Sequence, residues 1–118
     1  MVTTAELLAK QSHPKVDALN GEQITLYLTA VSEWALIGDK IERTYRFDDY
    51  HQTIAFVNVI ANIIHAEDHH PDLKIDFNHC VVRLNTHSVN QGKGGISEND
   101  FICAAKFDAA YSQSAFYG

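Results

Sequence analysis

The stretch from Asn20 to Trp34 carries apolar residues at the spacing of one helix face. They follow one another at i, i+3, i+4 and i+7, and they are Ile24, Tyr27, Leu28 and Val31. Asn20 suits the N-cap position, and Gln23, three residues later, completes the pattern of a capping box. We therefore expect a helix that begins after Asn20 and ends near Trp34. A shorter helix is expected over Thr4–Gln11, before the break at His13-Pro14.

A longer amphipathic pattern follows Asp48 and Asp49, each of which is a suitable N-cap. Its apolar stripe consists of Tyr50, Ile54, Val57, Ala61 and Ile64, and it is widened by Phe56, Ile60 and Ile63. Because the residue before a proline disfavours helical backbone angles, this helix must end before Pro71. A last helix is expected to open at Ser97, with a frayed tail from Ser112. Its apolar residues are Phe101, Ala104, Ala105 and Phe107.

Between the two longer helices, apolar and polar side chains alternate as they do in β-strands. Trp34–Ile37 is a short apolar run, Gly38-Asp39 is a turn signal, and Lys40–Phe47 then alternates. This pattern predicts a β-hairpin, in which Arg43 interrupts the apolar side. The apolar residues on that side are Ile41, Tyr45 and Phe47.

The extended segment from Ile75 to Thr86 changes the side on which its apolar residues fall. Ile75 and Phe77 are odd-numbered, whereas the next three are even-numbered: Cys80, Val82 and Leu84. Since successive side chains point to opposite faces, one unbroken strand cannot bury both sets on one face. We expect a bulge or a tight break near Asn78-His79, with Cys80–Thr86 as the firmer strand and His87 at its end.

The predicted order of elements is helix, two strands, helix, two strands or one bent strand, helix. This order favours an α+β fold, a two-layer sandwich in which an antiparallel four-stranded sheet has helices packed on one face. The other face is then open to solvent or to another copy of the chain. A length of 118 residues suits a single domain over residues 1–118.

Composition narrows the classes of partner. Hydrophobic residues make up 46% of the chain, enough for a core, and the net charge of −6 argues against direct binding to nucleic acid or to an anionic membrane. No apolar run approaches the ~20 residues of a membrane span, and the N-terminus lacks the pattern of a secretory leader. Cys80 and Cys103 are interpreted as buried free thiols, with a disulfide as the alternative, so we expect a cytoplasmic protein.

The candidate chemistry is concentrated in histidines. Five of the seven histidines lie between His65 and His87, and the run from His65 to Pro71 is the densest. An imidazole with an ordinary pKa of ~6.5 exchanges a proton near neutral pH. His69 and His70 are adjacent, so their side chains diverge, and His87 lies at a strand end. These positions make acid–base chemistry at a pocket the leading hypothesis.

Simpler roles remain open for several of these residues. His65, in the last turn of a helix, suits the helix dipole, and His51 and His79 suit surface or strand positions. Asp100 stands three residues after Ser97, which is the capping-box position, so spacing alone favours a cap.

Two other site classes also remain open. Neighbouring histidines with a distant His and Asp suit zinc or another divalent ion, although no HExxH spacing and no cysteine pair is present. The triplet Asp68-His69-His70 is also similar to that of the DHH phosphoesterases, which are larger and carry further aspartate motifs that this chain lacks.

The combined pattern resembles the signature of the pterin-4a-carbinolamine dehydratases. It consists of His65-x-x-x-His69-His70-Pro71, Phe77, His87 and Asp100. Supporting segments are Trp34, Phe47-Asp48-Asp49-Tyr50, Leu84-Asn85-Thr86-His87 and Gly94-Gly95-Ile96-Ser97-Glu98-Asn99-Asp100. The resemblance covers roughly residues 20 to 112 and leaves residues 1–19 as an extension. The chain departs from the common family pattern at His65, at Leu73 and in a longer loop over 88–95.

The resemblance implies an enzyme that dehydrates 4a-hydroxytetrahydropterin to quinonoid dihydropterin and so recycles a tetrahydropterin cofactor. It implies an α+β sandwich, a pterin substrate, no metal or other cofactor, and a homodimer or homotetramer. It also implies a protein partner for some members, since animal members act as transcriptional coactivators. A non-catalytic binding module or coactivator of the same fold is the alternative function, and a metal-dependent hydrolase is the next.

The resemblance also assigns roles to residues. The catalytic positions are His69, His70 and His87, with His69 and His87 at the reacting centre. The substrate-binding positions are His70, Pro71, Asp100, Thr86 and Asp68. For Asp100 this role competes with the helix cap, and one carboxylate can in principle serve both.

Overall fold

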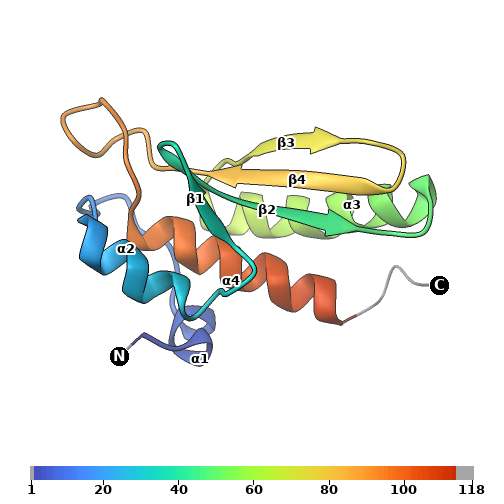
Figure 1. The fold of residues 1–118 in the computed structure, drawn as a ribbon, viewed down its shortest axis with the longest axis horizontal. Helices are drawn as coiled ribbons and strands as arrows, with labels where there is room; N and C mark the ends of the chain where they lie inside the picture. The colour runs from blue at the N-terminus through green and yellow to red at the C-terminus, as the bar shows by residue number, and fades with distance from the viewer. Residues whose placement is uncertain (1, 114–118) are drawn as a thin grey trace.

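The structure is a computed structural model that describes residues 2–113. Its helices and strands follow the predicted order, preceded by the short helix expected at the N-terminus. They are α1 (Thr4–Ala9), α2 (Gly21–Leu28), β1 (Ala35–Ile37), β2 (Lys40–Arg46), α3 (Tyr50–Glu67), β3 (Asp72–Ile75), β4 (His79–Leu84) and α4 (Glu98–Ser112). Figure 1 shows α3 and α4 on the same side of the sheet, so the predicted α+β sandwich is confirmed.

The sheet has the strand order β1-β2-β4-β3, and all three pairings are antiparallel. Ile41 pairs with Leu84 and Tyr45 with Cys80, and these four side chains are buried beneath the sheet. The hairpin between β1 and β2 turns at Gly38, whose φ of 63° is a conformation that glycine adopts readily.

Arg43 interrupts the apolar side of β2, and its charge is paired with a carboxylate. Its Nη1 donates to Asp108 Oδ1 at 2.7 Å, and its guanidinium lies 4.5 Å from the centre of the Tyr45 ring. The same Asp108 oxygen accepts hydrogen bonds from Trp34 Nε1 at 3.0 Å and from the Tyr45 hydroxyl at 2.5 Å. The prediction of the hairpin is therefore confirmed, with Arg43 on its inner side.

The predicted break near Asn78-His79 is confirmed as the turn between β3 and β4. Phe47 N–H donates to the carbonyl of Asn78 at 2.8 Å, which fastens this turn to the end of β2. β3 begins at Asp72, earlier than the predicted start at Ile75. The residues before Ile75 show no alternation of apolar and polar side chains long enough to predict a strand. Ile75 and Phe77 stay 39% and 65% exposed, so burial falls on the even-numbered residues of β4.

Helix α2 has the predicted start and a different end. Asn20 and Gln23 form both hydrogen bonds of the capping box, each at 2.9 Å. The predicted end near Trp34 is wrong, because the helix stops at Leu28. Beyond it the backbone continues with i→i−3 bonds, and the Thr29 hydroxyl bonds to the Leu26 carbonyl at 2.6 Å. This change from i→i−4 to i→i−3 hydrogen bonds ends the α-helix, and the backbone then turns towards β1.

Asp49 caps α3, and its side chain accepts the Gln52 N–H at 2.9 Å. The buried face of α3 is centred on Thr53, Phe56 and Ile60, so the predicted stripe was wrong in its centre. Tyr50, the first residue of that stripe, is 48% exposed. The helix is apolar around much of its circumference, and periodicity alone therefore did not decide which side faces the sheet.

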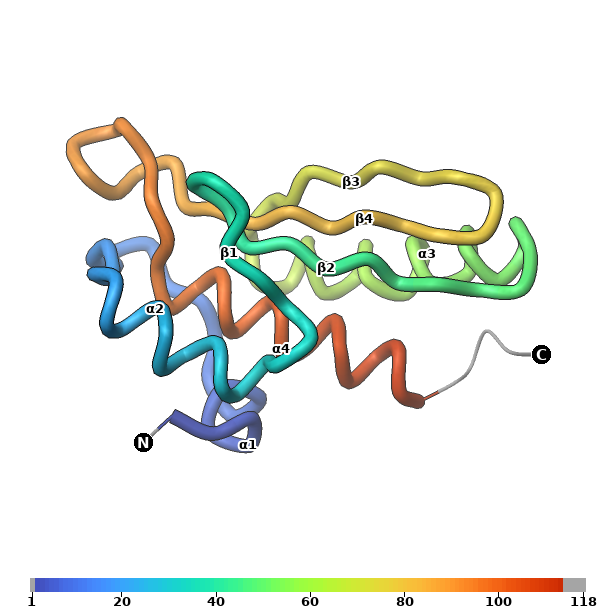
Figure 2. The backbone as a smooth tube through the Cα atoms, viewed as in Figure 1, coloured from blue at the N-terminus to red at the C-terminus, as the bar shows by residue number. Residues whose placement is uncertain are grey.

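The N-terminal residues belong to the same core. Helix α1 falls within the predicted Thr4–Gln11, and its Leu7 is fully buried. The chain then crosses the start of α4, as Figure 2 shows, and Leu19 N–H donates to the Ile96 carbonyl at 2.8 Å. Cys80 and Cys103 are buried free thiols, as predicted.

Helix α4 runs to Ser112, so the frayed tail predicted from that residue falls mostly outside the described part of the chain. Within the described residues, no helix is both long and apolar enough to cross a membrane.

Candidate active site

The histidine run leaves α3 through a left-handed residue. Asp68 is the C-cap of the helix, with φ 49° and ψ 43°, a conformation that aspartate tolerates better than most residues. Before it, Glu67 is buried and its Oε2 accepts Lys106 Nζ at 2.7 Å, so the end of α3 is fixed to α4. The turn at Asp68 therefore leads the chain away from the helix, and His69 reaches Asp100 at the start of α4.

His69 contacts a fully buried carboxylate. Its Nε2 lies 2.5 Å from Asp100 Oδ1, and the His69 side chain is only 11% exposed. Because a carboxylate can only accept, the Nε2 of a neutral His69 carries the proton, and Nδ1 is left free to exchange one. The pair thereby fixes both the orientation and the tautomer of the imidazole.

The second oxygen of Asp100 belongs to the start of α4. Oδ2 accepts the backbone N–H of Ser97 at 2.9 Å and the Thr86 hydroxyl at 2.9 Å. Since Thr86 donates its proton to Asp100, the 2.6 Å contact between Thr86 and Ser97 hydroxyls has Ser97 as donor. One carboxylate therefore caps the helix, as spacing predicts, and also holds His69, while the substrate contact that the resemblance implies for Asp100 stays a prediction.

Thr86 is positioned by a short bridge at the end of β4. Its N–H donates to the Gly95 carbonyl at 2.7 Å, and Gly95 N–H donates back at 3.1 Å. A Cβ on Gly95 would lie 2.8 Å from Asn90 Nδ2, so a larger residue there would displace the Asn90 side chain. The bridge fixes the loop that carries His87.

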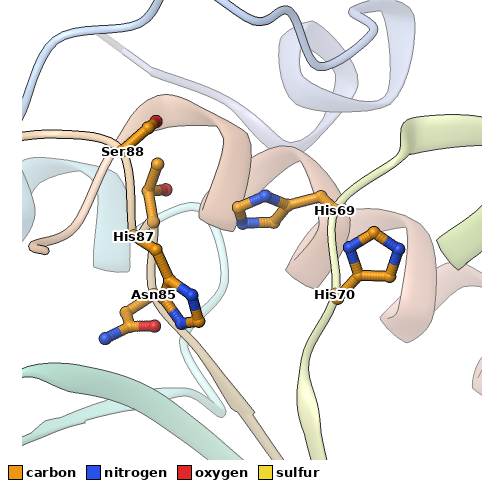
Figure 3. Close-up of a pocket in the computed structure, with 6 residues that line it drawn as sticks. His69, His70, Asn85, His87 and Ser88 are labelled. Atoms are coloured by element: carbon orange, nitrogen blue, oxygen red, sulfur yellow. The ribbon is translucent and has the colours of Figure 1, made fainter. Parts of the chain in front are cut away.

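The three predicted catalytic histidines line one pocket of about 200 Å³. Figure 3 shows the rings of His69 and His70 on one side and that of His87 on the other. His70 and His87 are exposed, in contrast to His69. Asn85, Thr86 and Ser88 complete the lining. The structure therefore brings together two histidines from the end of α3 and one from the end of β4.

Other predicted residues lie around this pocket. Asp100 is fully buried behind His69 and lines neither this pocket nor the larger one next to it. Asp68 lines only the larger pocket, and Pro71 lines neither. Their predicted contact with substrate stays a prediction. His65 is exposed in the last turn of α3 and lines neither pocket.

Sequence reasoning did not single out Ser88, nor the wall of the larger pocket formed by Ser12, His13 and Pro14. No motif marks these residues, because their role depends on how the N-terminus folds back. Among residues 2–113 no three His, Cys, Asp or Glu side chains are grouped to hold a metal ion.

Two buried groups near the site have shifted pKa values. Burial raises the pKa of Glu67, but hydrogen bonds from Lys106 and Ser12 outweigh burial and hold this pKa below its ordinary value. Burial raises the pKa of the Cys103 thiol to about 12, with Glu67 and Asp100 adding to the effect. Glu67 is therefore a charged anchor at neutral pH, and Cys103 is an uncharged part of the core.

The site and fold agree with known proteins. The family described as Pterin 4 alpha carbinolamine dehydratase matches residues 17–110. The chain therefore belongs to this family, and its members are dehydratases of the hydro-lyase class.

Individual relatives extend the match beyond these bounds. A protein of Bdellovibrio bacteriovorus, provisionally named pterin-4-alpha-carbinolamine dehydratase, is 58% identical over 109 residues, 92% of this chain and 91% of the relative. A similarly named protein of Paracidovorax citrulli is 45% identical over 96% of this chain and 99% of its own length. The crystal structure of a transcriptional coactivator/pterin dehydratase from Brucella melitensis has a TM-score of 0.72 at 27% identity, and covers 79% of this chain and 97% of that one.

Proposed function

We propose that the chain dehydrates a 4a-hydroxytetrahydropterin to the quinonoid dihydropterin by histidine acid–base catalysis. The observation that carries this proposal is the pocket shared by His69 and His87, with the buried carboxylate of Asp100 behind His69 at 2.5 Å. Family membership supplies the class of reaction and substrate.

The reaction needs two proton transfers in one pocket. The C–O bond at the hydroxylated ring carbon breaks, and the leaving hydroxyl takes a proton to become water. The neighbouring ring nitrogen loses a proton, and its electron pair forms the C=N bond of the product. One proton enters and one leaves, so one of His69 and His87 acts as acid and the other as base. Each such transfer is worth ~10²–10⁴-fold in rate.

The residues around the two histidines support the proposed acid and base roles. A charged imidazolium at His69 is stabilised by the Asp100 carboxylate, whichever direction its proton moves. His87 lies across the pocket on a loop fixed by the Thr86–Gly95 bridge. His70 sits beside His69 at the pocket edge, where we propose that it binds the pterin ring.

Rapid mixing of the purified protein with chemically generated 4a-hydroxytetrahydropterin tests the proposal. The absorbance change of dehydration should accelerate in proportion to the protein concentration. A rate equal to that of the buffer alone would refute the proposed activity.

The biological setting is proposed from the family. Recycling of a tetrahydropterin cofactor in the cytoplasm follows from the proposed reaction, and a homodimer or homotetramer follows from the resemblance. Light scattering of the untagged protein measures the assembly, and a monomer would contradict it.

A coactivator or other binding role is the second candidate, favoured by the name of the Brucella melitensis protein. Such a role predicts a specific protein partner whose binding survives His69→Ala and His87→Ala. Binding that needs the intact pocket would instead point to the dehydratase activity.

A further inference from the structure

A second pocket of about 460 Å³ lies next to the histidine pocket. The two share His69, Thr86 and Ser88 as lining residues, so they are adjoining chambers of one cavity system. A ligand whose reacting atom lies beside His69 and His87 therefore has room to extend past His69 into the second chamber. The far wall of that chamber is the segment Ser12–Pro14.

This wall is fastened to the helix ends that carry the catalytic groups. The backbone N–H of His13 donates to Asn99 Oδ1 at 3.2 Å, and Asn99 Nδ2 donates to the His13 carbonyl at 2.8 Å. The backbone N–H of Ser12 donates to Glu67 Oε1 at 2.8 Å, and its hydroxyl donates to the Glu67 carbonyl. The segment is thus held from both sides, at the end of α3 and at the start of α4.

The wall lies outside the part of the chain that the family description covers. That match begins at residue 17, after Pro14. The histidine pocket is thus built wholly from the shared domain, whereas the second chamber needs residues that precede it. The Paracidovorax citrulli relative matches 96% of this chain, so a difference in substrate would depend on the side chains at Ser12–Pro14 and not on the presence of the segment.

The polar groups of the chamber suit a hydroxylated ligand. His13 Nδ1 donates to the Lys15 carbonyl at 2.8 Å, so the Nε2 of the neutral ring is an acceptor. Asp68 adds a carboxylate whose side chain is 93% exposed, and Ser88 adds an exposed hydroxyl. Two acceptors and one group that both donates and accepts match the O–H groups of a hydroxyalkyl chain.

We propose that the second chamber receives a hydroxyl-bearing substituent of the pterin ring, and that Ser12–Pro14 select among pterins by this substituent. This assignment rests on the proposed function, which places the pterin ring beside His69 and His87. His13 acts as a specificity-determining residue through its Nε2, and the reacting carbon stays beside His69 and His87.

Binding of two stable dihydropterins tests the assignment without turnover. One carries a dihydroxypropyl substituent and the other a methyl group at the same ring position, and calorimetry gives both dissociation constants. The wild-type protein should prefer the hydroxylated compound. His13→Ala and His13→Phe should reduce that preference about 3- to 10-fold, the effect of one hydrogen bond, with little change for the methyl compound. His13→Phe keeps the bulk of the wall and removes both ring nitrogens, the Nε2 acceptor and the Nδ1 donor to the Lys15 carbonyl.

His79→Ala is the matched control, because His79 lies at the other end of β4 and pairs with Asp76 at 3.0 Å. It should leave the preference unchanged. A wild-type protein without the preference, or His13 variants that retain it, would overturn the assignment. If the wild-type protein binds both compounds but dehydrates neither corresponding carbinolamine, the proposed reaction fails while the binding ratios still decide the role of the chamber.

Discussion

The Nε2 of His69 and the Oδ1 of Asp100 lie 2.5 Å apart, and the carboxylate that makes this contact is fully buried. The same carboxylate caps α4 through the backbone N–H of Ser97. The His69 imidazole is therefore held by the helix start, and a change at Asp100 should alter both stability and the proposed catalysis.

Asp100→Asn should lower kcat by about 10²-fold or more, because a neutral amide does not stabilise a charged His69. The amide also presents a donor to groups that themselves donate, which should reduce the free energy of unfolding by about 1–3 kcal/mol. Stopped-flow kinetics and urea unfolding measure the two effects.

Asp108→Asn provides the matched control, since Asp108 is another α4 carboxylate that accepts several hydrogen bonds far from the pocket. It should lose stability while the folded enzyme keeps its kcat. Equal kcat values in the two folded variants would contradict a specific role for Asp100.

Thr86→Val should reduce the free energy of unfolding by about 1–3 kcal/mol at nearly constant side-chain volume. The substitution removes the hydroxyl that donates to Asp100 and accepts from Ser97, and it leaves both buried groups short of a partner. Urea unfolding measures the loss. Thr86→Ser keeps the hydroxyl and should retain most of this stability, and an equal loss in both variants would show that the methyl group mattered instead.

The stabilising effect of Glu67 should decline in acid. Its pKa in the folded protein is held below the ordinary value of 4.5 by Lys106 and Ser12, despite burial. Because the pKa is lower in the folded protein, the contribution of Glu67 to the free energy of unfolding is fully present above pH 4.5. This contribution is lost as the pH falls through the folded-state pKa. The difference in unfolding free energy between wild type and Glu67→Gln should therefore shrink between pH 6 and pH 3.

Glu33→Gln is the control for this titration, because Glu33 is exposed and makes no ion pair with any residue of the described chain. Its difference from wild type should stay small across the same pH range. A Glu67→Gln difference that stays constant with pH would contradict the charged anchor.

The sequence predicted most elements because local signals and burial agreed there. The Asn20–Gln23 capping box is confirmed, and the change of parity before Cys80, which allows a bulge or a tight break, corresponds to the break between β3 and β4. The centre of the buried side of α3 was predicted wrongly, because many apolar residues surround that helix and only the sheet decides which of them are most covered. The end of α2 was missed because Thr29 begins a tighter turn without a proline or glycine.

The candidate site was predictable only where a motif marks it. His69, His70 and His87 were singled out by the dense histidine run, the strand end and the family resemblance, and they line one pocket. The placement of Asp100 behind His69 is a tertiary relationship, and spacing indicated only the helix cap. In the sequence, His13 was interpreted only as part of a helix break at His13-Pro14. The fold of the N-terminal segment against α3 and α4 places it in the wall of the larger pocket.

The most direct test of the account is the single-turnover rate of carbinolamine dehydration in His69→Ala and His87→Ala, with His79→Ala as a control histidine. We expect the dehydration rate to fall by about 10²–10⁴-fold in each of the first two variants and to stay at the wild-type value in the control, with all three proteins folded. Wild-type rates in His69→Ala and His87→Ala would contradict it.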